Sequence, residues 1–249
     1  MSIKSILSLP FANYIVSKNK KWKNNAKKYQ SKVFCSLIKN GKNTLFGKEH
    51  GFSSINTYSD FKKRVPIRDY EGLSGYIEKI KNGENNILWP KKPIYFCKTS
   101  GTTSGTKYIP ISKESMPNHI IAARDAILSY ISETKNISIV KGKMIFLQGS
   151  PILSKTGGVL TGRLSGIVAH HIPSYLNKNR LPSFKTNCIE NWELKVDKIV
   201  DETINQKMSL ISGIPPWVQM YFEKLNKKSG KLIKDLFPNF DLFIYGGVN

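Results

Sequence analysis

Short apolar runs alternate with stretches of helical periodicity along this chain of 249 residues. Continuous runs of mostly hydrophobic residues are typical of strands that are buried on both faces of a parallel sheet. They predict four strands, at residues 94–97, 144–147, 208–211 and 242–245. Apolar positions at three- and four-residue steps predict helices at residues 11–40, 69–80, 112–131, 191–205 and 215–225. Residues 152–166, which are rich in Gly, Ser and Thr, predict a long loop.

The alternation of strands and helices favours an α/β fold with a largely parallel β-sheet and flanking helices. Residues 11–90 form a mainly helical segment in this interpretation, and residues 91–249 form the α/β core. Ligands of open α/β sheets bind beyond the carboxyl ends of the strands. Four turns follow predicted strands and could line one crevice, namely the turns after Cys97, at residues 148–150, at residues 213–216 and at residues 246–247.

The turn after Cys97 reads Thr-Ser-Gly-Thr-Thr-Ser-Gly-Thr-Lys over residues 99–107. Its glycines allow close approach of the backbone, and its hydroxyls, N–H groups and lysine suit a polyphosphate. It is neither a Walker loop nor a dinucleotide fingerprint, because the glycine and lysine spacings differ from both. A solvated surface loop is the structural alternative. The candidate phosphate-binding residues are Thr99, Ser100, Gly101, Thr102, Thr103, Ser104, Gly105 and Lys107.

Residues 96–110 resemble the phosphate-binding signature of adenylate-forming enzymes, the superfamily of acyl-CoA synthetases and luciferases. Three further segments, at residues 61–70, 212–217 and 243–249, are similar to the auxin-responsive Gretchen-Hagen-type acyl acid–amido synthetases, in particular their bacterial relatives. The four segments occur in the family's order. The resemblance covers most of the chain.

The resemblance implies a ligase that forms carbon–nitrogen bonds. Such an enzyme uses ATP and Mg²⁺ to adenylate a small carboxylic acid, and then transfers the acyl group to an amino acid. It implies a nucleotide and acyl pocket at Gly246, Gly247, Val248 and Asn249. It also implies that Gly213, Ile214, Pro215 and Trp217 border the acyl side, although a helix start with a packed tryptophan explains the same residues.

Members of this family are about twice as long as this chain. The expected segments that contact AMP, the metal and the ribose, and the mobile C-terminal domain, do not occur in these 249 residues. We therefore interpret the chain as an N-terminal fragment that does not complete the reaction alone. No catalytic residue and no metal ligand is assigned within it.

The formal net charge is +22, from 39 Lys and Arg against 17 Asp and Glu. Such a charge suggests nucleic acid or an anionic membrane as partner. However, only five of the basic residues are Arg, and the lysines are spread along the chain. The lysine cluster at residues 18–29 is therefore interpreted as a solvated helix face, without specific nucleic-acid binding. A non-enzymatic basic binding module and a thioester-forming acyl-CoA synthetase remain the alternatives.

The three cysteines, Cys35, Cys97 and Cys188, are far apart and show no metal-ligand spacing. They indicate a reduced, cytoplasmic protein, which we expect to be a monomer. No apolar run is long enough for a membrane helix, so no membrane partner is expected. His170 and His171 are adjacent and point in different directions, which disfavours a shared metal. Three acidic residues of the helix at 191–205 are predicted to pair with surface lysines: Asp197, Asp201 and Glu202.

Overall fold

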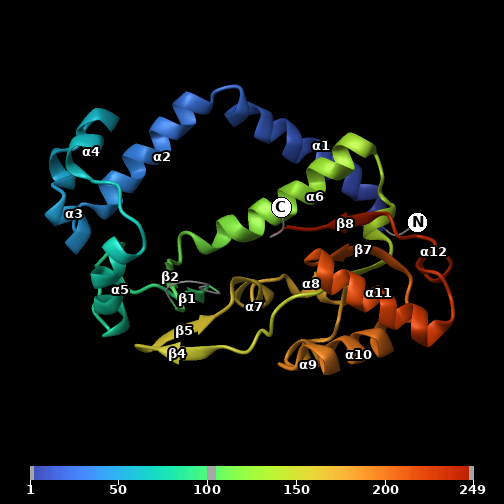
Figure 1. Ribbon diagram of the computed structural model, residues 1–249. Helices are drawn as coiled ribbons and strands as arrows, with labels where there is room; N and C mark the ends of the chain where they lie inside the picture. Colours follow the sequence, from blue (N-terminus) through green and yellow to red (C-terminus); the bar gives the residue numbers. More distant parts are fainter. Residues whose placement is uncertain (1–2, 100–104, 247–249) are drawn as a thin grey trace. The chain divides into compact units, whose positions relative to one another are not determined.

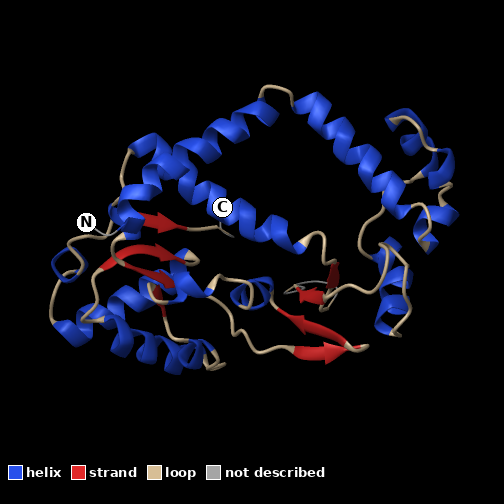
Figure 2. Ribbon diagram, turned by 180° about the vertical axis from the view of Figure 1, so that it is seen from behind, coloured by secondary structure: helices blue, strands red, loops and turns tan. Residues whose placement is uncertain are grey.

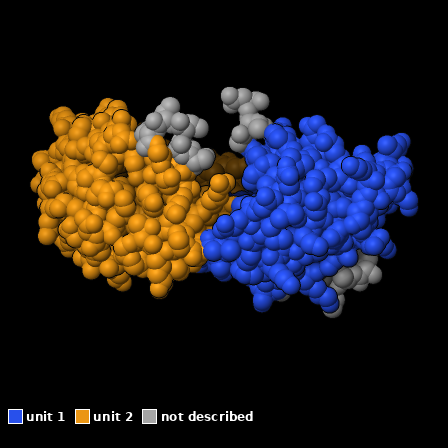
Figure 3. Space-filling model, turned by 60° about the horizontal axis from the view of Figure 1, so that its bottom comes forward, with its two compact units in different colours: residues 1–17, 120–152, 168–249 blue, residues 18–119, 153–167 orange. Residues whose placement is uncertain are grey.

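The computed structural model describes residues 3–99 and 105–246 of the chain. It divides into two compact units that interleave along the sequence (Figure 3). Unit 1 contains residues 1–17, 120–152 and 168–249, and unit 2 contains residues 18–119 and 153–167. Each unit has its own four-stranded sheet and its own hydrophobic core.

The sheet of unit 1 is entirely parallel, with the strand order β6-β3-β7-β8. Its strands β7 and β8 lie side by side (Figure 1). These strands are β6 (Arg180–Leu181), β3 (Lys143–Phe146), β7 (Met208–Ser212) and β8 (Leu242–Ile244). The first four residues of β7 are fully buried, as a continuous apolar run in a central parallel strand requires.

Helices cover both faces of this sheet (Figure 2). One face packs against α10 (Trp192–Thr203) and α11 (Pro215–Ser229), which bury residues such as Ile199 and Leu225. The second core combines parts of α1 (Ile3–Lys23), α6 (Met116–Thr134) and η3 (Ser138–Val140) with Leu242 of β8. The short α8 (Ser174–Asn177), α9 (Phe184–Asn187) and α12 (Ile233–Leu236) complete the helices of unit 1.

The ends of α11 follow from local chemistry. Pro215 and Pro216 occupy its first two positions, where a missing N–H costs no hydrogen bond. Gly230 ends it in the left-handed conformation at φ 67°. On α10, the Asn191 side chain caps the helix by accepting a hydrogen bond from Leu194 N at 3.0 Å.

The sheet of unit 2 is mixed and has the order β2-β1-β5-β4. Its central pair, β1 (Tyr95–Lys98) and β5 (Val159–Gly162), is parallel. The outer strands, β2 (Tyr108–Ile111) and β4 (Ser154–Thr156), are antiparallel to their neighbours. The remaining elements are α2 (Ala26–Gly41), α3 (Leu45–Glu49), η1 (Phe52–Ser54), α4 (Tyr58–Arg64), η2 (Glu71–Leu73) and α5 (Ser74–Lys81), with α7 (Leu164–Ala169) at the boundary of the two units.

The α/β class and all four predicted strands are confirmed. The predicted long loop at residues 152–166 is wrong, because it contains the hairpin β4–β5 and the start of α7. Gly157 and Gly158 form its turn at φ 56° and 77°, and paired glycines of this kind are typical of tight hairpins. The abundance of glycine in residues 152–166 suggested a loop, but Gly157 and Gly158 form only the turn of a hairpin.

The single helix predicted at residues 11–40 is also wrong in detail, because α1 and α2 are separated at Asn24 and Asn25. The apolar residues whose spacing predicts this helix lie on an exposed face. Tyr29, Val33 and Leu37 are 43%, 57% and 50% exposed. The buried side of α2 contains Ile38 and Gly41 instead. Periodicity thus identifies a helix and a face, but not what covers that face.

Candidate functional site

The turn predicted to bind phosphate connects the antiparallel strands β1 and β2 within unit 2. At its base, Thr99 N donates to Lys107 O at 3.1 Å, and Lys98 pairs with Tyr108. Gly105 has φ 79°, which favours glycine there. The predicted residues Ser100, Gly101, Thr102, Thr103 and Ser104 lie outside the described residues. The turn is therefore the end of a hairpin, and not a strand-to-helix connection.

Three ammonium groups surround two tyrosine rings at the base of this hairpin. Lys107 Nζ lies 5.2 Å from the Tyr70 ring centroid, and Lys81 Nζ and Lys98 Nζ lie 4.9 Å and 6.0 Å from that of Tyr108. The rings are linked by a 2.8 Å hydrogen bond from Tyr108 N to Tyr70 Oη. Contacts between cations and aromatic faces hold the lysine side chains in place and leave the positive field intact.

Only one of these cations has a carboxylate partner among the described ion pairs, because Lys81 Nζ lies 2.7 Å from Glu78 Oε1. The base of the hairpin is therefore a positive surface that attracts anions. Sequence reasoning found Lys107 but missed Lys81 and Lys98. Lys81 and Lys98 both contact the ring of Tyr108. Because Lys81 lies 27 residues before Tyr108 in the sequence, no local pattern connects the two residues.

In unit 1, the strands that precede three of the four predicted turns are neighbours in the parallel sheet, and their carboxyl ends are joined by hydrogen bonds. Leu147 N donates to Ser212 O at 2.8 Å, and Gly213 N donates to Ile244 O at 3.1 Å. A Cβ at Gly213 would lie 2.9 Å from Leu147 Cβ, so a side chain there would push the turns apart. Gly246 follows two residues after β8, whereas Gly247, Val248 and Asn249 lie outside the described residues.

The segment from Gly213 to Trp217 forms the start of α11. Ile214 is its N-cap residue and Pro215 its first residue. Trp217 stacks on Trp192 with ring centroids 4.1 Å apart and an interplanar angle of 28°. The structural explanation, a helix start with a packed tryptophan, therefore holds. The helix start and the tryptophan stacking do not test whether these residues border the acyl group.

A fully buried lysine lies beside this edge. Lys195 is 2% exposed, and its Nζ donates to Gln148 O at 3.0 Å and to Asn187 O at 2.7 Å. Burial lowers the pKa of this ammonium group to about 8. No sequence pattern indicates this role, because Lys195 is one lysine among many and both of its partners are main-chain carbonyls.

The other predicted side chains have structural roles. His170 Nε2 bonds Pro151 O at 2.8 Å, and the described residues contain no group of three His, Cys, Asp or Glu that could hold a metal. Asp197 pairs with Lys224 at 2.5 Å, and Asp201 pairs with Lys228, as predicted. The prediction for Glu202 is wrong, because its carboxylate accepts from Ser183 N at 2.7 Å and supports the start of α9.

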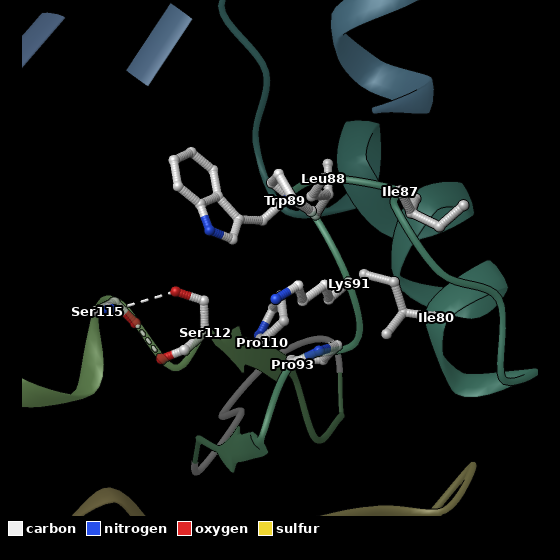
Figure 4. A pocket seen from close by; sticks show the side chains of 10 residues that line it. Ile80, Ile87, Leu88, Trp89, Lys91, Pro93, Pro110, Ser112 and Ser115 are labelled. Carbon is white, nitrogen blue, oxygen red and sulfur yellow. Dashed lines mark hydrogen bonds between the residues drawn. The ribbon is translucent and has the colours of Figure 1, made fainter. Parts of the chain in front are cut away.

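Unit 2 also contains a cavity of about 200 Å³ that sequence reasoning missed (Figure 4). Its wall is mostly apolar, and the lining residue Trp89 donates a hydrogen bond of 3.1 Å from Nε1 to Glu114 Oε2. Ser115 N donates to Ser112 Oγ at 3.1 Å within the wall. The lining residues are Ile80, Ile87, Leu88, Trp89, Pro90, Lys91, Pro93, Pro110, Ser112 and Ser115, none of which is a predicted site residue.

The family model of the GH3 family N-terminal domain matches residues 16–181, which is most of the chain and includes the β1–β2 hairpin. The chain belongs to the GH3 family. The family resemblance seen in the sequence is thereby confirmed. No helix in the described parts of this GH3 chain is long and apolar enough to cross a membrane.

Curated members of the family share low identity with this GH3 chain over about half of its length. Indole-3-acetic acid-amido synthetase GH3.3 of Arabidopsis thaliana is 28% identical over 139 residues, which cover 54% of this chain and 22% of that protein. Jasmonoyl--L-amino acid synthetase JAR4 of Nicotiana attenuata is 26% identical over 140 residues, covering 55% of this chain and 24% of that protein. This chain therefore matches only a minor part of each relative's length.

A solved structure of AtGH3.15 acyl acid amido synthetase in complex with 2,4-DB has the same fold. The TM-score is 0.69 at 18% sequence identity, and the match covers 90% of this chain and 42% of that one. The α/β architecture derived from the strand pattern is thus that of a GH3 protein.

Proposed function

We propose that this GH3 chain supplies the ATP-binding part of an acyl acid–amido synthetase. The observation that carries the proposal is the β1–β2 hairpin, which lies within the family match and has Lys81, Lys98 and Lys107 at its base. The named activities of GH3.3 and JAR4 support amide formation between a carboxylic acid and an amino acid.

The chemistry has two steps. A carboxylate oxygen attacks the α-phosphorus of ATP, the bond to pyrophosphate breaks, and an acyl-AMP forms. An amine then attacks the acyl carbonyl carbon, AMP leaves with the bonding electron pair, and the amine loses a proton. Indole-3-acetic acid, which is named for GH3.3, supports an apolar carboxylic acid as the substrate class.

The protein contributes position and charge to the first step. We assign the β- and γ-phosphates to the hydroxyls and N–H groups of residues 99–105 and to the Lys107 ammonium group. Mg²⁺ would neutralise charge on the phosphates, and no residue of this chain is assigned to it. We assign Gly246, Gly247, Val248 and Asn249 to the nucleotide and acyl pocket, and Gly213, Ile214, Pro215 and Trp217 to the acyl side.

A bisubstrate analogue tests this assignment on the chain itself. An adenylating site binds the acyl-AMP form more tightly than either half, because it is complementary to the reacting state. We expect an acylsulfamoyl adenosine with an apolar acyl group to bind at least tenfold more tightly than AMP in isothermal titration. Equal affinity for the analogue and AMP, or no binding of either, would argue against the proposal. Competition by coenzyme A would instead favour a thioester-forming ligase.

A further inference from the structure

Lys195 is a buried cation whose hydrogen-bond partners come from two separate segments. Gln148 follows β3 by two residues, and Asn187 is the last residue of α9. Both of their main-chain carbonyls lie within 3.0 Å of Lys195 Nζ. One ammonium group therefore joins three elements: the turn after β3, the end of α9 and helix α10.

A carboxylate would be the usual partner of a buried ammonium group, but no ion pair within the described residues includes Lys195. Hydrogen bonds from a charged donor to carbonyls are stronger than neutral ones. Burying a lysine also carries a desolvation cost that a leucine or methionine would avoid. A core that only needed filling would therefore favour an apolar residue at this position.

The segment held by Lys195 is part of the carboxyl edge described above. Leu147, the residue before Gln148, packs closely against Gly213. Its N–H donates a hydrogen bond to Ser212 O. Gly213 in turn donates to Ile244 O, two residues before Gly246. Fixing Gln148 therefore fixes the turn against which the start of α11 and the end of β8 are placed.

The amide side chains of the two segments contain buried atoms without partners. Gln148 Nε2 and Asn187 Oδ1 are buried and make no hydrogen bond among the described residues, so these atoms do not anchor their segments. The main-chain carbonyls of both residues are bonded to the Lys195 ammonium group instead. The Glu202 carboxylate of α10 holds the start of α9 through Ser183 N, so Lys195 supplies the charged contact at the end of α9 and at the turn after β3.

We propose that Lys195 is a positioning residue, which holds the turn after β3 in register with the turns after β7 and β8 at the carboxyl edge of the unit 1 sheet. The inference rests on the proposed function, because this edge is where the adenylate and acyl groups are assigned. It adds a residue that touches no ligand to the set that shapes the pocket.

Hydrogen–deuterium exchange of the 249-residue chain tests the proposal without any ligand. The variant Lys195→Met keeps an unbranched side chain one atom shorter and removes the charge together with its N–H donors. We expect exchange at the amides of Leu147 and Gly213, which donate to Ser212 O and Ile244 O, to become at least tenfold faster, with residues 218–229 of α11 unchanged. Lys198→Met is the matched control, because Lys198 lies on the exposed side of the same helix and pairs with Asp201 at 3.4 Å. It should leave all of these amides unchanged.

Two results would overturn the proposal. Unchanged exchange at the Leu147 and Gly213 amides in Lys195→Met would show that the turn does not depend on Lys195. An equal acceleration throughout unit 1 would show a general stabilising role. Lys195→Arg, which keeps the charge, should restore at least half of the lost protection on a logarithmic scale, whereas a purely steric role predicts no rescue.

If Lys195→Met does not fold, Lys195→Gln takes its place, because it removes the charge and keeps a neutral N–H donor. Exchange at the Leu147 and Gly213 amides should again become faster, with residues 218–229 of α11 unchanged. Unchanged exchange at Leu147 contradicts the proposal. Because no nucleotide is present, failure of the adenylation proposal would appear separately, as absent analogue binding.

Discussion

The hydroxyl groups of Thr203 and Tyr221 lie 2.7 Å apart in the core between α10 and α11, and both residues are 0% exposed. Thr203 Oγ1 also donates to Ile199 O at 2.6 Å. The threonine hydroxyl is therefore the acceptor for the tyrosine proton. Burial raises the pKa of Tyr221, so the phenol remains a donor at neutral pH.

This geometry predicts that two conservative variants lose different amounts of unfolding free energy. Tyr221→Phe leaves Thr203 bonded to Ile199 and should cost about 1 kcal/mol of unfolding free energy. Thr203→Val leaves the buried phenol without its acceptor and should cost about 2–3 kcal/mol. Urea unfolding of both variants and of the double variant measures this. A double variant as destabilised as the sum of the single ones would show that the two hydroxyls do not interact.

The two glycines of the β4–β5 turn should respond very differently to alanine. A Cβ at Gly157 would lie 1.8 Å from Lys81 O, whereas a Cβ at Gly158 meets nothing within 4 Å. Both have positive φ, so Gly158→Ala should cost about 1–2 kcal/mol. Gly157→Ala should cost at least about 3 kcal/mol, because backbone must move. Thermal melting of the pair tests the contact, and equal melting temperatures would exclude it.

The pH dependence of stability should report the burial of Lys195. Its pKa is lowered from 10.5 to about 8 in the folded state. Below pH 8 both the folded and the unfolded chain carry this proton, so it adds no pH dependence. Between pH 8 and 10.5 the unfolded chain binds it and the folded chain does not, so the unfolding free energy rises with pH.

The rise due to Lys195 should be on the order of 3 kcal/mol across this interval. It is measured as the difference between wild type and Lys195→Met in chemical unfolding at pH 7.5, 8.5 and 9.5, which cancels the titration of the other lysines. Ionisation of Cys97, whose pKa is raised by burial, cancels in the same way. A difference that does not change with pH would mean that Lys195 titrates at its ordinary value.

The sequence predicted the strands well because a buried parallel strand has a local signature. The run at residues 208–211 became β7, with its first four residues fully buried. The sequence could not divide the strands between two sheets, because pairing such as that of Phe96 with Thr161 connects residues 65 positions apart. The hairpin β4–β5 was missed because its glycines outweighed a short, partly exposed strand pattern.

The same limits apply to the candidate site. Glycines and hydroxyls in one short segment identified residues 99–107, and a family resemblance strengthened that interpretation. Lys195 was missed because its importance lies in burial and in two carbonyls that any residue could supply. Helix α2 shows that a clear local pattern can also mislead. Tyr29, Val33 and Leu37 recur with helical periodicity, yet their side chains are exposed and no described element covers them.

Titration of the 249-residue chain with ATP and Mg²⁺ tests the central claim most directly. The affinity for ATP is compared between wild type, Lys107→Ala and Lys113→Ala. Lys113 is an exposed lysine that follows β2. A phosphate contact from Lys107 should make ATP binding at least about tenfold weaker in Lys107→Ala, because hydrogen bonds to charged groups contribute about 1.5–3 kcal/mol. Lys113→Ala should bind like wild type. Equal affinities in all three proteins, or loss of the same size in both variants, would contradict a phosphate-binding hairpin.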